Sequence, residues 1–175
     1  MVVAALLLGS CGSLLHAQNE ANAELEYKVK AGFIFNFLKF VSWPKESHSD
    51  SWNIGVIAAE GIVELVSETL AGKTIEGRSV KVFKFNPKAE GQDCHVLFIC
   101  QKLTDRTSEF SETLRGTPIL IVGESKGFAQ AHGIIGFVKK GQNLRLEINP
   151  SRAKGAGLVI SGKLASLAEL VEDIR

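Results

Sequence analysis

The sequence predicts an α/β fold with three layers, in which a largely parallel sheet is flanked by helices and carries an antiparallel hairpin at its edge. Apolar runs rich in β-branched residues, typical of strands covered on both faces, alternate with helical segments over the first two thirds of the chain. Such alternation implies crossover connections and parallel pairing. Residues 134–138 and 144–148 then flank a turn at Lys140 to Asn143, which is typical of a hairpin.

Composition indicates one globular domain, which we place at residues 25–175. The chain has 175 residues, of which 45% are hydrophobic, so it can bury a sizeable core. Its formal charge is +1, with acidic and basic residues interspersed. A nucleic-acid partner is not expected, because binding domains of that kind usually carry a basic stripe.

The first 17 residues are interpreted as a signal peptide, which predicts a periplasmic protein. Residues 2–8 are apolar. The segment ends at the small residue Ala17, as signal peptides do, and we place cleavage after it. The expected positive charge at the start is missing. Two alternatives stay open. One is a lipoprotein anchored at Cys11, because the run Leu8-Gly9-Ser10-Cys11 resembles a lipobox; the other is an ordinary apolar tail.

A helix is expected over residues 25–41, and its apolar arc is wider than one packing face requires. Its four phenylalanines lie on both sides of a stripe that runs from Tyr27 to Val41. The stretch is too short and too polar for a membrane span. Burial within the domain is one explanation, and a dimer or partner surface is the other. The second explanation assigns that surface to Phe33, Phe37, Phe40 and Trp43.

The remaining elements follow from periodicity and end signals. Strands are expected at 52–58, 79–85, 94–99, 119–122 and 158–160, and helices at 62–70, 105–114, 128–131, 150–156 and 162–174. Gly72 is a plausible stop for the helix before it, whereas Asn149 and Ser161 are expected to cap the helices that follow them.

Two cysteines, Cys94 and Cys100, would remain after cleavage, and we expect no disulfide between them. If the segment between them is a strand, they lie roughly 20 Å apart, at about 3.3 Å per residue. A disulfide needs Cα atoms within about 7 Å of each other. Two small buried side chains are the favoured interpretation, and a bridge between chains through Cys100 is the alternative.

No residues stand at a spacing that indicates catalysis, so neither an enzyme nor a cofactor is predicted. His48, His95 and His132 lack a cysteine or carboxylate at ligand spacing, which argues against a zinc site. Ser125 lies in a Gly-rich turn without the flanks of a nucleophile elbow. It is the only candidate nucleophile for the least favoured hypothesis, a hydrolase.

One stretch has the features of a ligand site. If residues 119–122 form a parallel strand, the following turn lies beyond its carboxyl end, where open α/β sheets bind ligands, and at a helix start that suits an anion. A plain tight turn is the alternative. Candidate ligand residues are Gly123, Glu124, Ser125, Gly127 and Phe128, with Arg145 and Glu147 from one face of the last hairpin strand.

Three blocks of sequence resemble the YfiR-like family of periplasmic proteins. Residues 27–44 are similar to its opening helix, residues 122–129 to its central turn, and residues 145–149 with 156–164 to its closing block. The resemblance implies a homodimeric regulator that binds the periplasmic part of a membrane diguanylate cyclase and lowers cyclic-di-GMP synthesis and biofilm formation. The best-known member has redox-sensitive disulfides, for which Cys94 and Cys100 give no support here. A small-ligand sensor without a cyclase partner is the alternative function.

Overall fold

The structure is a computed structural model that describes residues 10–44, 49–86, 93–100, 113–114, 116–141 and 143–174, with side chains from residue 17 onward. Its helices are α1 (Ser10–Phe40), α2 (Ile62–Leu70), α4 (Phe128–Ala131), α5 (Pro150–Gly155) and α6 (Gly162–Ala165). Its strands are β1 (Val41–Ser42), β2 (Ser51–Ile57), β3 (Thr74–Ile75), β4 (Arg78–Lys84), β5 (Val96–Ile99), β6 (Leu120–Gly123), β7 (Ile135–Lys140), β8 (Asn143–Ile148), β9 (Val159–Ile160) and β10 (Glu169–Leu170).

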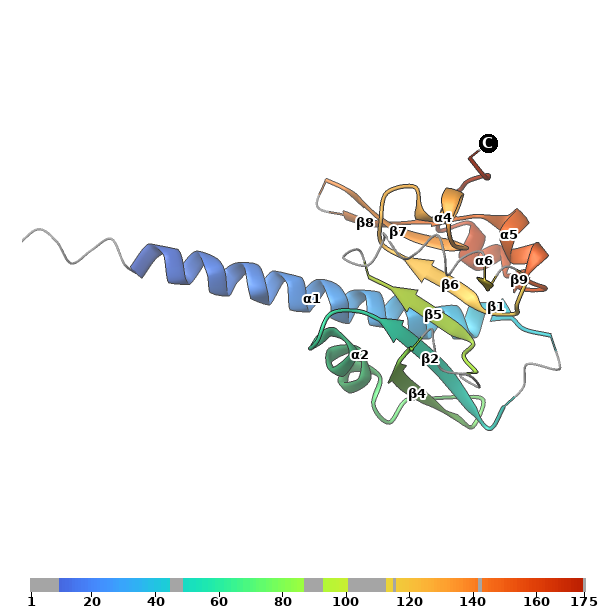
Figure 1. Cartoon of the computed structure of the whole chain (residues 1–175), viewed down its shortest axis with the longest axis horizontal. Coiled ribbons are helices and arrows are strands. Elements are labelled where there is room, and N and C mark those ends of the chain that lie inside the picture. The colour runs from blue at the N-terminus through green and yellow to red at the C-terminus, as the bar shows by residue number, and fades with distance from the viewer. Residues whose placement is uncertain are drawn as a thin grey trace, which may run out of the picture.

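The predicted α/β fold is confirmed. In the described residues, eight strands form one sheet in the order β10-β8-β7-β6-β5-β2-β4-β3, and β1 and β9 form a small antiparallel sheet. Strands β4, β2, β5, β6 and β7 are parallel neighbours. Their carboxyl ends therefore lie along one edge of the sheet, and their amino ends along the other (Figure 1).

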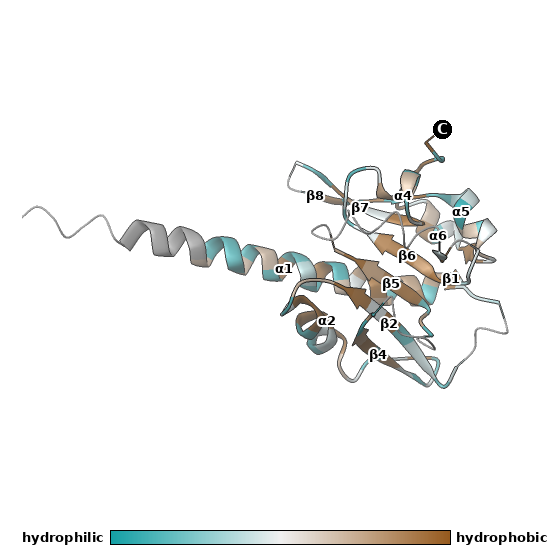
Figure 2. Cartoon of the chain, in the orientation of Figure 1, coloured by the Kyte–Doolittle hydropathy of each residue, from teal (hydrophilic) through white to brown (hydrophobic). Residues whose placement is uncertain are grey.

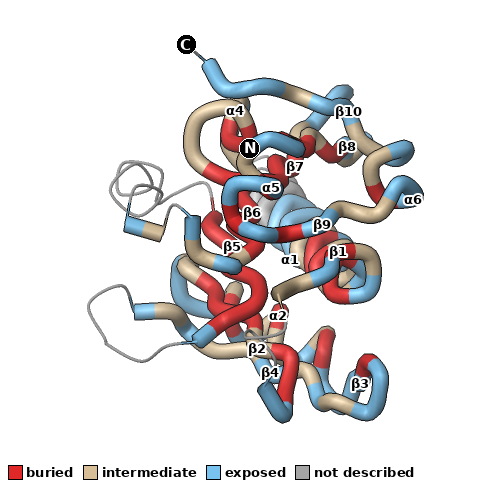
Figure 3. The backbone as a smooth tube through the Cα atoms, turned by 90° about the vertical axis from the view of Figure 1, so that its right-hand side faces the viewer, coloured by how far each residue is buried: buried red, intermediate tan, exposed pale blue. Residues whose placement is uncertain are grey.

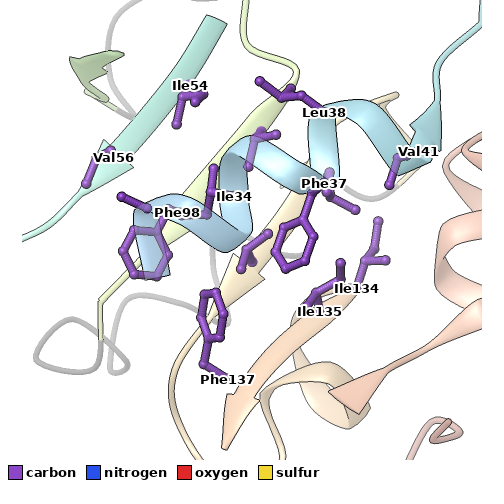
Figure 4. Close-up of a cluster of buried hydrophobic side chains, with 14 of the residues drawn as sticks. Ile34, Phe37, Leu38, Val41, Ile54, Val56, Phe98, Ile134, Ile135 and Phe137 are labelled. Atoms are coloured by element: carbon purple, nitrogen blue, oxygen red, sulfur yellow. The ribbon is translucent and has the colours of Figure 1, made fainter. Parts of the chain in front are cut away.

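The core lies between the sheet and α1, which crosses one face of the sheet beside α2 (Figure 1). Ile34 and Phe37 of α1 are fully buried and point toward Phe98 and Phe137 of the sheet (Figure 4). Phe37 and Phe137 stack with ring centroids 6.1 Å apart. The wide apolar arc of α1 is thus largely explained by the sheet on one side and α2 on the other.

The first half of α1 projects beyond the sheet (Figure 1). We expected a helix only from residue 25, with a polar tail before it, but α1 begins at Ser10. The segment at 17–26 is rich in Ala and Glu, which favour a helix without needing burial. Every residue from 17 to 25 is exposed, and the projecting part is largely hydrophilic (Figure 2).

The hairpin prediction is confirmed, but the hairpin is not the edge of the sheet. Strands β7 and β8 pair antiparallel from Ile135 and Ile148 to Lys140 and Asn143. The outer side of β8 pairs with β10, which is parallel to it. We expected a helix over 162–174, and that prediction is wrong beyond Ala165, because the chain leaves the short α6 to form β10. Figure 3 shows this end of the molecule as mostly exposed.

Several other predictions concern the ends of helices. Asn149 caps α5 by accepting a hydrogen bond from the Arg152 N–H at 3.0 Å, and Ser161 caps α6 by accepting one from the Leu164 N–H at 3.2 Å. Gly72, just beyond α2, has a φ of 70°, which glycine adopts readily. The expected helix at 105–114 falls almost wholly outside the described residues, as do His48, the side chain of Cys11 and residues 1–9.

Candidate functional site

A buried polar cluster joins α1 to the carboxyl end of the parallel sheet. Because Ile99 of β5 is in register with Gly123 of β6, the residues that follow them, Cys100 and Glu124, leave the sheet side by side. Tyr27 and Lys30 are three positions apart on α1, so they share the face that turns toward this edge. Lys30 is 4% exposed, which is rare for a lysine.

The cluster is held by hydrogen bonds to one carboxylate. Tyr27 Oη donates to Glu124 Oε1 at 3.0 Å, and Lys30 Nζ donates to Glu124 Oε2. Lys30 also pairs with Glu26 at 2.6 Å, and Glu26 pairs with Lys139 of β7 at 2.5 Å. The charges alternate in sign along this chain of contacts, so each buried charge has a partner.

The surroundings of Lys30 and Tyr27 raise the pKa values of both side chains. Burial alone would lower the pKa of Lys30, but its hydrogen bonds to Glu124 and Glu26 outweigh burial and leave that pKa raised. Burial and then the Glu124 carboxylate raise the pKa of Tyr27. At neutral pH the cluster therefore contains an ammonium group and a neutral phenol.

The turn that the sequence singled out as a ligand site is shaped around Phe128. A Cβ atom at Gly123 would lie 2.3 Å from the Phe128 ring, and one at Gly133 would lie 2.0 Å from it. Glycine is thus required at both positions by the close approach of the ring. The Phe128 N–H donates to the Ser125 carbonyl at 3.0 Å, so the start of α4 uses this donor internally.

The structure brings together only part of the candidate ligand set. Glu124 and Glu147 both line a hollow of about 550 Å³ between α1 and the hairpin, together with Lys126. Arg145 is exposed and is not part of that hollow. Burial raises the pKa of Glu147, with a further contribution from Glu169, and its Oε2 is buried without a hydrogen-bond partner among the described residues. A ligand role for this set stays a prediction.

The candidate partner surface divides into enclosed and accessible side chains. Phe37 is 0% exposed, so its side chain belongs to the core of this chain. Phe33, Phe40 and Trp43 are half-buried. Leu25 and Val29, which were not predicted as part of this surface, are the exposed large apolar side chains in the described part of α1, at 61% and 43%.

The two cysteines are buried on opposite faces of the sheet. Cys94 packs with Leu97 and Phe128, whereas Cys100 belongs to the core under α1. Burial raises the pKa of the Cys94 thiol to about 12, and burial also raises the pKa of Cys100. Neither thiol is ionised at neutral pH, which makes both poor nucleophiles.

Sequence reasoning missed a second polar cluster, at the amino ends of the parallel strands. Arg78 at the start of β4, His95 just before β5 and Trp52 in β2 meet Trp43, which follows β1. The four residues come from four separate segments, and no spacing along the chain signals their meeting. Only the parallel register of β4, β2 and β5 could have indicated it.

Neither a metal site nor a membrane-spanning helix is found among the described residues. In that part of the chain, no group of three or more His, Cys, Asp or Glu side chains could hold a metal ion. None of the described helices is long and apolar enough to span a membrane.

Comparison with known proteins places the chain in a family. No curated protein matched the sequence. A family model described as YfiR/HmsC-like matches residues 27–169, which span the fold from Tyr27 of the buried cluster to the first residue of β10. The match covers well over half of the 175 residues, and the chain belongs to the YfiR/HmsC-like family.

Proposed function

We propose that this protein is a periplasmic regulator that binds an inner-membrane signalling protein, a diguanylate cyclase, and restrains it. Restraint of the cyclase would lower the cellular level of cyclic-di-GMP and reduce biofilm formation. The observation that carries this proposal is the family match over residues 27–169. The proposal assigns no chemical step to the chain, so the protein acts by contact and is not an enzyme.

The surface of α1 supports an action by contact. Its buried side is used by the sheet and α2, yet Leu25 and Val29 are exposed to solvent, at 61% and 43%. They lie four positions apart and therefore on one side of the helix. We propose that this strip, continued by the half-buried Phe33, Phe40 and Trp43, contacts the partner or a second copy of the chain.

Deleting the gene in the host bacterium and restoring it tests the proposal without knowledge of the partner. Deletion should raise cellular cyclic-di-GMP, and the unaltered gene should lower it again. A chain with Leu25→Glu and Val29→Glu should fold, because both residues are exposed, but should fail to lower cyclic-di-GMP. Ile174→Glu, at a 64% exposed apolar residue remote from α1, is the matched control and should act like the unaltered chain.

Two results would contradict the proposal in different ways. Cyclic-di-GMP that does not change on deletion would remove the cyclase link. A normal effect of the double variant would remove the assigned surface and leave the regulatory function standing.

A second candidate function is a periplasmic small-ligand sensor without a cyclase partner. It is favoured by a cavity of about 200 Å³ that is lined by Trp43, Trp52, Arg78 and His95, among others. If deletion of the gene leaves cyclic-di-GMP unchanged and the cavity binds a ligand, the sensor is the favoured function.

A further inference from the structure

Strand β7 extends beyond one of its two neighbours in the sheet. In the described part of the chain, β7 pairs with β8 from Ile135 to Lys140, whereas its pairing with β6 is confined to Ile135 and Gly136. Gly136 is in register with Gly123, the last residue of β6. Residues 137–140 therefore continue β7 with no described strand on the side of β6, and we call this stretch the open edge.

The open edge presents main-chain hydrogen-bonding groups. Residues of an antiparallel pair direct their main-chain groups alternately toward the partner strand and away from it. The Asn149 N–H donates to the Ile134 carbonyl at 2.9 Å, so that carbonyl faces β8, and the main-chain groups of residues 136, 138 and 140 do the same. Lys139 therefore directs its N–H and C=O away from β8, at the place that a further strand would occupy.

A hollow of about 550 Å³ follows the open edge. All four residues of the open edge line it, and so do Glu124 and Lys126 from the turn after β6. Four residues of a strand span about 13 Å. The hollow thus runs beside enough of β7 to take a short extended segment of polypeptide, in the position where that segment would continue the sheet.

One carboxylate of the hollow lacks a partner. Glu147 of β8 is in register with Gly136, and its Oε2 lies 3.7 Å from the position that a Cβ atom on Gly136 would take. Because Gly136 has no side chain, the carboxylate lies over β7, beside the hollow that Glu147 also lines. Its Oε2 is buried and has no hydrogen-bond partner among the described residues. A buried acceptor without a donor is costly, which favours a donor supplied from outside.

The charges around the hollow indicate what kind of segment fits. The two other carboxylates of the lining, Glu26 and Glu124, are both paired with lysines. A lysine or arginine of the incoming segment would supply Glu147 with a donor and an opposite charge. A second copy of β7 fits poorly, because two open edges side by side would bring Lys139 and Lys140 of both copies together.

We propose that the open edge binds an extended segment of another protein, which adds a strand to the sheet and carries a lysine or arginine. The main chain of the segment exchanges hydrogen bonds with Lys139, and its basic side chain donates to Glu147. In strand addition the main-chain bonds provide affinity and alternate side chains provide specificity. The site is separate from the strip at Leu25 and Val29, and the proposal does not depend on a cyclase partner.

Random heptapeptides displayed on phage test the site without knowledge of the natural partner. Selection against the immobilised chain should enrich peptides that contain a lysine or arginine. A synthetic copy of an enriched peptide should bind at least about tenfold more weakly when alanine replaces that residue, because hydrogen bonds between charged groups are strong. Methylation of alternate main-chain nitrogens should abolish binding in one register and spare it in the other, because only alternate N–H groups of the peptide face β7.

Substitutions at Lys139 test the main-chain contact. Lys139→Pro removes the N–H that points away from β8 and keeps the pairing with β8, so peptide binding should fall at least about tenfold. Lys139→Ala keeps the N–H and is the matched control, which should bind like the unaltered chain. Circular dichroism checks that both variants fold. If Lys139→Pro does not fold, the methylated peptides decide the matter on the unaltered chain.

Substitutions of carboxylates test the charge contact. Glu147→Gln should weaken binding at least about tenfold, because the basic side chain loses its charged partner. Glu60→Gln alters an exposed glutamate outside the hollow and should bind like the unaltered chain. The variant with Leu25→Glu and Val29→Glu should also bind the peptide normally, so that this site and the proposed regulatory surface are tested independently.

Four results would each overturn the proposal. They are a selection that enriches no peptide, an enriched peptide that does not need a basic residue, methylation that has the same effect in both registers, and binding by folded Lys139→Pro or Glu147→Gln that is as tight as in the matched control.

Discussion

A lysine and a glutamate that are almost excluded from solvent carry the strongest residue-level constraint in this protein. The side chains of Lys30 and Glu124 are each 5% exposed, and they connect α1 to the turn after β6. Taking two charges out of water is expensive, and their attraction offsets that cost only while both are present. Their pairing therefore does more to fix how α1 lies on the sheet than to add net stability.

Glu124→Gln should destabilise the chain by about 3–5 kcal/mol, because it leaves the Lys30 ammonium buried with one charged partner fewer. Urea unfolding followed by circular dichroism measures the loss. The control is Glu169→Gln, which breaks a pair with Lys140 whose side chains are 56% and 57% exposed. That control should cost at most about 1 kcal/mol. Equal losses in the two variants would contradict a special role for burial.

Glu147 should make stability depend on pH in the opposite direction from a paired carboxylate. Burial raises its pKa above the ordinary 4.5, so the folded state holds the proton more tightly than the unfolded state does. Stability from this residue is therefore lost as pH rises from about 4.5 through the raised pKa. Glu147→Gln should be more stable than the unaltered chain at pH 7, and the difference should vanish below pH 4.5. Urea unfolding at a series of pH values checks this, and a constant difference would contradict it.

Among the elements, α5 depends on one residue more than its short length suggests. Asn149 is 0% exposed, and its Oδ1 caps the helix. Its Nδ2 donates to the Ala129 carbonyl at 3.0 Å and to Asp173 at 2.9 Å. The one side chain therefore ties α5 to α4 and to the segment after β10.

Asn149→Ala should cost more than the loss of an ordinary cap. A cap contributes typically about 1 kcal/mol, and the Ala129 carbonyl would lose its bond as well, so we expect a loss of at least about 2 kcal/mol. Ser161→Ala removes the cap of α6 alone and should cost about 1 kcal/mol. Thermal and urea unfolding of both variants test the difference. A smaller loss in Asn149→Ala than in Ser161→Ala would contradict the tie between elements.

Elements that follow from local periodicity could be predicted from the sequence. An element that forms only by pairing with the exposed edge of another strand could not. The buried run at β6 and the hairpin at β7 and β8 follow from side-chain patterns within a few residues. β10 depends on an unpaired edge of β8 far back in the chain, so the pattern of residues 162–174 suggested a helix instead. Gly123 was noticed, but its reason, the ring of Phe128, is visible only in three dimensions.

The same limit explains the outcome for the sites. Glu124 was proposed as a ligand residue because it follows a parallel strand, and the structure places it at that edge. Its partners, Tyr27 and Lys30, lie almost a hundred positions away, and no local pattern announces them. Arg78 and His95 meet only through the register of β4, β2 and β5, so the cavity between them had no signal in the sequence.

At the scale of the whole molecule, one long helix serves both the core and the solvent. Its second half is enclosed by the sheet and α2, and its first half stands clear of the body (Figure 1). Residues 17–25 are all exposed, so they contribute little to the stability of the single chain. A helix with 31 residues is about 46 Å long at 1.5 Å per residue, which leaves ample surface for a second copy.

We therefore expect the chain from residue 18 onward to form a dimer through the strip at Leu25 and Val29. Sedimentation equilibrium should give twice the chain mass at micromolar concentration. Leu25→Glu with Val29→Glu should shift the mass toward the monomer, because a charge at each exposed apolar position must be desolvated on association. Leu167→Glu with Leu170→Glu alters two residues that are 66% and 56% exposed at the other end of the fold and should leave the dimer intact. A monomer at every concentration would exclude self-association, and a dimer lost only in the control pair would place the interface beside β10 instead of on α1.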